Sequence, residues 1–411
     1  MRLIKVLTDN LANLEDPRVI GRTKHSLVDV VALSVIAVMS HAESFVEIEE
    51  FGNYKYKWLK KILKLSNGIP SHDTIARVFC LLDHKQLERI FMEWVESMRK
   101  DLDGPDVISI DGKTIRGTGS MRSGHQQNYL HLLNIWSTRM GLVLGQLKCE
   151  KGHGERKTTI DALQLINVKG TTILTDAGIG SNYVASEIIN KGGNYIFPVK
   201  KNTRPLYFEI EKFFKQIDKG VIKKSSKASV KESSRGRKET RNCVLVNIKK
   251  LPKNINAHSF RDEYFPNLAM IGKIVYTSTR AQIGAYQFKT VGDKKNNLIK
   301  RIRTTSPIKV ETSTRYFVTN LHLNAKKLLN RVRDHWAIEN KLHWVLDVNY
   351  GEDASRVRNK NIASNLAIIR KIAFNLAKQD TSLKKSIKCR LKIAAWDESY
   401  LERILFKKNI P

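Results

Sequence analysis

The residues of this chain most suited to chemistry lie at 334–347, where one acid interrupts an apolar pattern. At helical spacing, one stripe carries Leu329, Val332, Trp336, Leu342 and Leu346. Glu339 falls within that stripe. A carboxylate on a face expected to be buried is costly unless it is paired or binds a metal. The spacing therefore predicts either an ion pair, with Arg333 or Lys341, or a metal-binding role for Glu339.

Two other acids end strand-like apolar runs far upstream. Asp111 ends the run 107–111 and is followed by Gly, Lys113 and Arg116, an arrangement suited to holding a metal beside a phosphate. Asp176 ends the run 171–176, before a glycine-rich turn that matches no nucleotide-binding loop. For both acids, ordinary turn capping is the alternative interpretation.

Three carboxylates from two strands and a helix are typical of a site for divalent cations that act on phosphodiesters. We therefore expect Asp111, Asp176 and Glu339 to be catalytic and to bind two Mg²⁺ or Mn²⁺ ions, which would lie ~3.5–4 Å apart. His343, one turn beyond Glu339, offers a Glu-x-x-x-His pair as a second possibility. Competing third acids, ranked lower, are Asp347, Glu352 and Asp353.

The charge balance indicates a polyanionic partner. The 411 residues include 72 Lys and Arg against 40 Asp and Glu, a net charge of +32. Basic side chains that neutralise phosphates release condensed counterions, which favours binding. The side chains expected to contact DNA are Lys113, Arg116, Lys200, Lys201, Arg237, Arg241, His335, His343, Trp344, Arg356 and Arg358. A solvated charged face is the alternative for each basic cluster, and core packing is the alternative for Trp344, as it is the expectation for Trp336.

Cysteine usage and hydropathy argue against export. The four cysteines are isolated, without metal-ligand spacing, which is typical of a reducing compartment. The longest apolar run, 27–39, is too short for a bilayer, which needs ~20 residues. Since residues 1–10 lack a signal-peptide core, we expect a cytoplasmic, nucleoid-associated protein with no membrane contact.

The elements that must position these acids follow an α/β order. Helices are expected at 27–40, 44–65, 71–82 and 85–100, with Ser71 capping the third. Strands are expected at 107–111, 129–136, 142–149, 171–176 and 194–199, with helices at 158–168 and 182–191. Three adjacent strands followed by strand–helix alternation predict a mixed five-stranded sheet.

A basic region separates the fifth strand from the helix of Glu339. We interpret 203–317 as a β-rich insertion, with 225–241 polar and mobile and strands at 242–248, 268–276 and 315–319. The tail from Arg356 onward is helical and basic. The expected domains are an N-terminal helical domain (1–103), a catalytic core (104–202 and 318–378), the insertion (203–317) and a helical tail (379–411).

Several motifs together resemble bacterial insertion-sequence transposases of the DDE type, in the H-repeat-associated subgroup. The matching segments are 69–74, Ile110-Asp111-Gly112-Lys113-Thr114, Asp176-Ala177, 236–241, 335–340, 342–348, Glu352-Asp353, Trp396-Asp397 and Tyr400-Leu401. Two segments depart from the pattern, at 151–155 and 179–181. The Tyr-Arg-Glu-Lys signature of neighbouring subgroups is also replaced, by Val332, His335 and Leu346 around Glu339.

The resemblance implies a ribonuclease-H-like core with Asp111, Asp176 and Glu339 as its metal-binding triad. It also implies that the chain binds terminal inverted repeats, cleaves to expose 3′-hydroxyls and joins them to target DNA. Double-stranded DNA and a homodimer assembled on it are the expected partners. Two alternatives stay open: a metal-dependent DNA endonuclease without strand transfer, and a catalytically inactive DNA-binding remnant.

Overall fold

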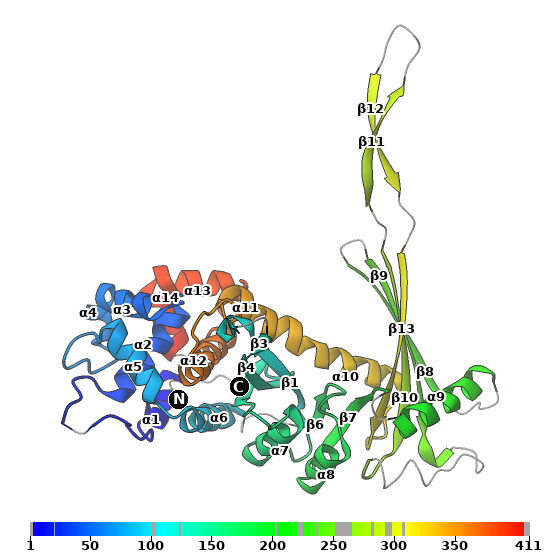
Figure 1. Cartoon of the computed structure of the whole chain (residues 1–411), viewed down its shortest axis with the longest axis horizontal. Coiled ribbons are helices and arrows are strands. Elements are labelled where there is room, and N and C mark those ends of the chain that lie inside the picture. The colour runs from blue at the N-terminus through cyan, green and yellow to red at the C-terminus, as the bar shows by residue number, and fades with distance from the viewer. Residues whose placement is uncertain are drawn as a thin grey trace. The chain divides into compact units, whose positions relative to one another are not determined.

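Two compact units make up the structure. The computed structural model describes residues 3–19, 21–99, 104–122, 125–127, 129–201, 204–220, 225–234, 237–250, 265–280, 283–291, 298–305 and 309–406. Unit 1 comprises Met1–Asn194 and Asp334–Pro411, and unit 2 comprises Tyr195–Arg333. Each unit is described by itself below, with the elements labelled as in Figure 1.

Unit 1 begins with helices, as expected. These are α1 (Leu3–Leu11), α2 (Leu27–Met39), α3 (Phe45–Tyr54), α4 (Tyr56–Leu59), α5 (His72–Leu81) and α6 (His84–Arg99). The Ser71 hydroxyl caps α5 by accepting from the Thr74 N–H, so the predicted cap is confirmed. The single helix predicted over 44–65 is wrong. The backbone leaves α-helical geometry at Lys55 (φ −102°, ψ 12°), which separates α3 from α4.

The sheet of unit 1 is mixed and carries the strands predicted from apolar runs. Its strands are β1 (Val107–Ile115), β4 (Leu130–Ser137), β5 (Leu142–Lys148) and β6 (Thr172–Thr175). β4 pairs antiparallel with both β1 and β5, whereas β6 runs parallel to β1. A small antiparallel hairpin is formed by β2 (Ser120–Arg122) and β3 (His125–Gln127). Along the chain, α7 (Glu155–Leu165) precedes β6 and α8 (Asn182–Asn190) follows it.

The helix α12 (Lys360–Gln379) is the centre of unit 1. Its residues 363–377 are all buried, and it packs against α2, α5 and α6 and against the strands β4 and β5 (Figure 1). Asn361 and Asn365 donate side-chain hydrogen bonds to backbone carbonyls at the end of α5, which fixes that helix on α12. The predicted helical tail is confirmed by α12, α13 (Ile387–Trp396) and α14 (Glu398–Phe406).

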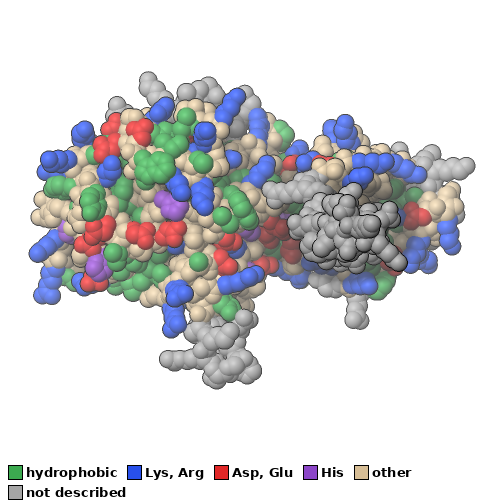
Figure 2. Space-filling model, turned by 90° about the horizontal axis from the view of Figure 1, so that it is seen from above, with side chains coloured by type: hydrophobic (Ala, Val, Ile, Leu, Met, Phe, Trp, Pro, Cys, Tyr) green, Lys and Arg blue, Asp and Glu red, His purple; other side chains and the backbone are tan. Residues whose placement is uncertain are grey.

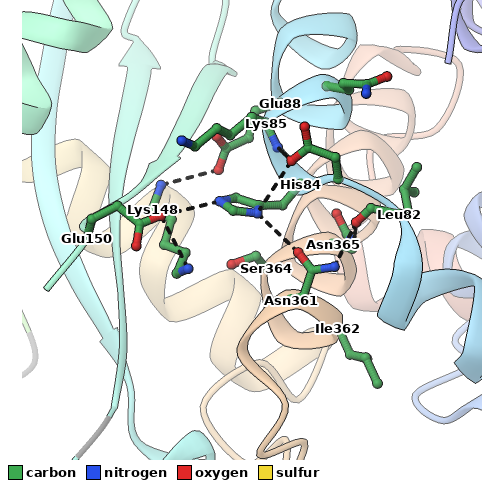
Figure 3. Close-up of polar contacts among 12 residues, drawn as sticks. Leu82, His84, Lys85, Glu88, Lys148, Glu150, Asn361, Ile362, Ser364 and Asn365 are labelled. Carbon is green, nitrogen blue, oxygen red and sulfur yellow. Dashed lines mark hydrogen bonds and ion pairs between the residues drawn. The ribbon is translucent and has the colours of Figure 1, made fainter. Parts of the chain in front are cut away.

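The contact between α6, β5 and α12 is polar (Figure 3). His84 of α6 lies 3.1 Å from the Asn361 side-chain oxygen and 3.7 Å from a carboxylate oxygen of Glu150. Glu88, also from α6, accepts a hydrogen bond from the backbone N–H of Lys148 at the end of β5. The N-terminal helices are thus joined to the sheet by directed bonds as well as by apolar contact.

Unit 2 is rich in strands, as predicted for the insertion. They are β7 (Asn194–Val199), β8 (Ser226–Ser234), β9 (Arg237–Asn247), β10 (Met270–Arg280), β11 (Ile283–Val291), β12 (Leu298–Thr305) and β13 (Lys309–Thr319). The segment 225–241, predicted to be polar and mobile, contains β8 and the start of β9. Its polar residues are ordered by an antiparallel ladder from Ser226–Leu245 to Ser234–Arg237. An unpredicted helix, α9 (Arg204–Asp218), precedes β8.

The prediction of a five-stranded sheet needs correction. Within unit 1 the strand order is β5-β4-β1-β6, and within unit 2 it is β7-β13-β10-β9-β8. Strands were expected where β9, β10 and β13 lie, but not in one sheet with β7, because apolar periodicity does not show which strands pair. Within the described residues, none of the helices combines the length and apolar character needed to cross a membrane.

Candidate active site

Strand pairing brings the first two acids to neighbouring positions, although β1 continues to Ile115, so Asp111 lies within its strand and not at the end as predicted. β1 and β6 run parallel, with Ile110 opposite Thr175. The next residue of each strand is therefore an acid, Asp111 or Asp176, at neighbouring positions. Asp176 also has the turn role proposed as its alternative, because its Oδ1 accepts the N–H groups of Gly178 and Ile179, both at 2.8 Å. The turn holds the carboxylate in a defined orientation.

The surroundings of Glu339 differ from the prediction. The helix α10 (Ala325–Ile338) passes into a single π-helical turn, Glu339–His343, and then into α11 (Trp344–Asn349). The buried side chains here are Ile338, Leu342 and Leu346. Glu339 is exposed, so its predicted burial is wrong.

The π turn explains this difference. A π turn contains one more residue than an α turn, so the apolar stripe changes register where the turn begins. Trp336, expected in the core, is only half-buried. Arg333, one predicted ion-pair partner of Glu339, pairs instead with Glu232 at 2.6 Å, and Lys341, the other, is exposed like Glu339 itself.

Electrostatics link the three acids. Burial, followed by the negative charges of Asp176, Glu339 and Glu155 in that order, raises the pKa of Asp111 to about 7. Such repulsion requires the carboxylates to lie near one another. The structure thus brings together the three acids singled out in the sequence and adds a fourth.

Glu155 is the residue that sequence reasoning missed. It is the first residue of α7, and its Oε1 lies 2.7 Å from Nε2 of His131. The other ring nitrogen of His131, Nδ1, lies 2.8 Å from the Thr114 hydroxyl. Both partners come from the paired strands β4 and β1. The only signal in the sequence was the position of Glu155 at a predicted loop–helix boundary, in the segment 151–155 that departs from the family pattern.

His343 lies beside Asp111 in a form without charge. Its Nδ1 is 3.8 Å from Asp111 Oδ2, and its Nε2 is 3.3 Å from the Asn134 side-chain nitrogen. Burial, and next the positive charge of Lys113, lower the pKa of His343 to about 3. A neutral imidazole here can take part in a hydrogen bond with Asp111 but supplies no charge for phosphate binding. His335 is half-buried on α10.

The donor set suits a hard cation. Carboxylate oxygens are the ligands that Mg²⁺ and Mn²⁺ prefer, and the crowding that raises the Asp111 pKa would be relieved by a bound cation. Among the described residues, however, no three His, Cys, Asp or Glu side chains already converge on one metal position. The acids fit such an ion by chemistry and proximity, without forming a ready-made cage.

The residues expected to contact DNA fall into two groups. Exposed side chains belong to Arg116, Lys200, Lys201, Arg237, Trp344, Arg356 and Arg358. Arg241 instead bonds Glu232 and Glu239. Lys113 is buried, with its ammonium bound to Asp347 and Glu352. A buried ammonium is not placed to bind phosphate. Its ion pairs also occupy Asp347 and Glu352, two of the acids that competed with Glu339 for the third position.

Comparisons with known proteins identify the class. Residues 102–376 match a family model described as "Transposase DDE domain", and residues 8–95 match the model described as "DDE_Tnp_1-associated". This chain belongs to the DDE transposase family.

Two relatives cover nearly the whole length. "Putative transposase YncI" from Escherichia coli O157:H7 is 34% identical over 404 residues, covering 98% of this chain and 95% of the relative. "H repeat-associated putative transposase YhhI" from E. coli K12 is 30% identical over 402 residues, covering 98% of each. The resemblance drawn from the motifs is thus confirmed. A solved synaptic complex of piggyBac transposase with hairpin DNA covers 98% of this chain and 80% of its own, but at 8% identity and a TM-score of 0.40.

Proposed function

We propose that this chain is a transposase that binds the terminal inverted repeats of an insertion sequence, cleaves phosphodiester bonds there and transfers the 3′-hydroxyl ends to target DNA. The observation that carries the proposal is that the charges of Asp176, in the turn after β6, and of Glu339, in the π turn, both act on the Asp111 carboxyl of β1. The mixed pairing of β5, β4, β1 and β6 is compatible with the ribonuclease-H-like core that the family resemblance implies.

In this proposal each acid acts as an oxygen ligand. Asp111, Asp176 and Glu339 would hold two Mg²⁺ or Mn²⁺ ions, which when bound supply charge stabilisation and activation of the attacking oxygen. The Asp176 turn and the neutral His343 beside Asp111 would keep two of these carboxylates oriented. The exposed basic side chains near residues 116 and 356–358 would contact backbone phosphates without reading sequence. Trp344, 58% exposed, would stack on a base at a DNA end.

The test is a cleavage and joining assay. The protein is incubated with a labelled terminal-repeat duplex, a target plasmid and Mg²⁺. We expect joined products from the native chain, and loss of cleavage with retained duplex binding in Asp111→Asn, Asp176→Asn and Glu339→Gln. Asp161→Asn, an exposed acid on α7, is the matched control and should cleave normally.

Other outcomes separate the alternatives. Cleavage without joining would indicate an endonuclease, and binding without cleavage would indicate a DNA-binding remnant. Normal cleavage by Glu339→Gln would contradict the assignment of the third acid. Because two ends must be handled together, the active species is expected to be a homodimer on DNA, which mass photometry of the native chain with and without duplex would detect.

A further inference from the structure

Behind the acids lies a buried ionic cluster that the proposed chemistry does not use. Lys113 of β1 bonds Asp347 and Glu352, and Lys371 of α12 bonds the second Glu352 oxygen at 3.2 Å. Lys371 also donates to the Gln146 side-chain oxygen at 2.7 Å. Glu352 and Lys371 are fully buried, and Lys113 is 8% exposed. Two cations thus bond two anions, of which Glu352 lies in the core of unit 1 and Asp347, 34% exposed, lies at its margin.

The cluster joins the two segments that carry Asp111 and Glu339. Lys113 follows Asp111 by two residues on β1, so both side chains leave the same face of the strand. Asp347 lies on α11, which continues from the π turn of Glu339 without a break. One ammonium therefore spans from the strand of the first acid to the helix of the third.

Backbone contacts reinforce the same junction. The Arg116 N–H donates to Asp353 Oδ1 at 2.7 Å, and the Gly117 N–H donates to the Asp353 carbonyl at 3.0 Å. A Cβ on Gly117 would lie 2.3 Å from the Ser355 carbonyl oxygen, so only glycine allows this approach. The segment after α11 is held against the turn that follows β1, Arg116–Thr118, by contacts that depend on position rather than on a long side chain.

We infer that Lys113 is a positioning residue, which sets the place of Glu339 relative to Asp111 by clamping α11 to β1 through Asp347 and Glu352. The catalytic consequence of this inference rests on the proposed function, whereas the structural clamp does not. Buried ion pairs add little net stability, since desolvation offsets their attraction. Their best-attested use is to specify one arrangement over others, which is what a shared site built from distant segments needs.

The test compares Lys113→Met with Asn375→Ala. Asn375 is also buried on α12 and bonds both backbone groups of Val143 on β5, so its loss weakens the same core without touching the β1–α11 junction. Both variants are studied below their unfolding temperatures. Hydrogen–deuterium exchange of residues 339–349 needs no activity and therefore tests the clamp even if the native chain cleaves nothing.

Exchange at 339–349 should accelerate at least tenfold in Lys113→Met and stay at the native rate in Asn375→Ala. In the cleavage assay, kcat of Lys113→Met should fall about 100-fold, the size of effect that a misplacement of about 1 Å produces, with KM within twofold of the native value. Asn375→Ala should keep the native kcat.

A native rate of hydrogen–deuterium exchange at 339–349 in Lys113→Met would overturn the clamp. A raised KM with unchanged kcat would instead make Lys113 a DNA contact. Absence of cleavage by the native chain would contradict only the proposed function.

Discussion

Glu88 is a carboxylic acid held almost out of solvent on α6. Burial raises its pKa to about 8, although the Lys148 backbone N–H and side-chain charge favour ionisation. An unfolded chain would ionise this group near its ordinary pKa of 4.5. Between these two values the folded state keeps the proton and the unfolded state releases it. The free energy of unfolding should therefore fall as pH rises from about 4.5 to about 8.

Glu88→Gln is the corresponding prediction. The amide oxygen can still accept from Lys148, but it has no proton to lose. The variant should gain stability relative to the native chain as pH rises, by on the order of a few kcal/mol at pH 8. Denaturant unfolding at pH 5, 6.5 and 8 measures this. Parallel pH curves for the two proteins would show that Glu88 does not titrate as described.

At the scale of single residues, the sequence indicated which side chains could take part in chemistry, but not which residues surround them in the fold. Asp111 and Asp176 were identified because they end apolar runs, and Glu339 because it interrupts an apolar helical stripe. Glu155 escaped notice because a glutamate beginning a helix is ordinary, and only the fold shows which carboxylate it faces. Lys113 was assigned to DNA because its charge is visible in sequence while its partners Asp347 and Glu352 are more than 230 positions away.

At the scale of elements, apolar periodicity predicted most of the strands and helices of unit 1 but missed a helix of unit 2. The helix α9 had such a signal, since its buried residues are Leu206, Ile210, Phe213, Phe214 and Ile217, at helical spacing. Its basic and polar neighbours led to the region being interpreted as β-rich. The π turn left no signal of its own, because extrapolating one α-helical period across 329–346 gives a plausible stripe with the wrong register.

The π turn supplies a prediction about Glu339. Deleting the exposed Asn340 removes the extra residue and allows a continuous α-helix. If Leu342 and Leu346 keep their buried positions, Glu339 rotates by about 100° relative to them. We expect cleavage to be lost, duplex binding to be kept and the unfolding temperature to change little.

Lys341→Ala is the control for this deletion. It alters the same turn without changing its residue count, and it should cleave at least at half the native rate. Cleavage by the deletion variant at the native rate would mean that the π turn does not set the position of the third acid.

At the scale of the whole molecule, charge is the dominant property. The net charge is +32, and Figure 2 shows Lys and Arg side chains over much of the visible surface. Binding to any duplex should weaken steeply with salt, because the slope of log K against log salt concentration is about −0.9 per phosphate neutralised.

The double variant Arg356→Ala with Arg358→Ala should reduce the magnitude of that slope by about 2. Fluorescence anisotropy at several KCl concentrations measures it. Arg18→Ala, which removes a cation already paired with Asp16, should leave the slope unchanged.

The span between Lys113 and its partners has a consequence for protein synthesis. Asp347 is 234 residues further along the chain, and Glu352 is 239. At 5–20 residues per second, a ribosome needs about 10 to 50 s to reach them after Lys113 has been made. During that interval β1 can pair with β4, but its ammonium has no counter-charge, and the segment that bears Glu339 does not yet exist. A nascent chain could therefore bind nearby DNA through its basic side chains well before it could cut it.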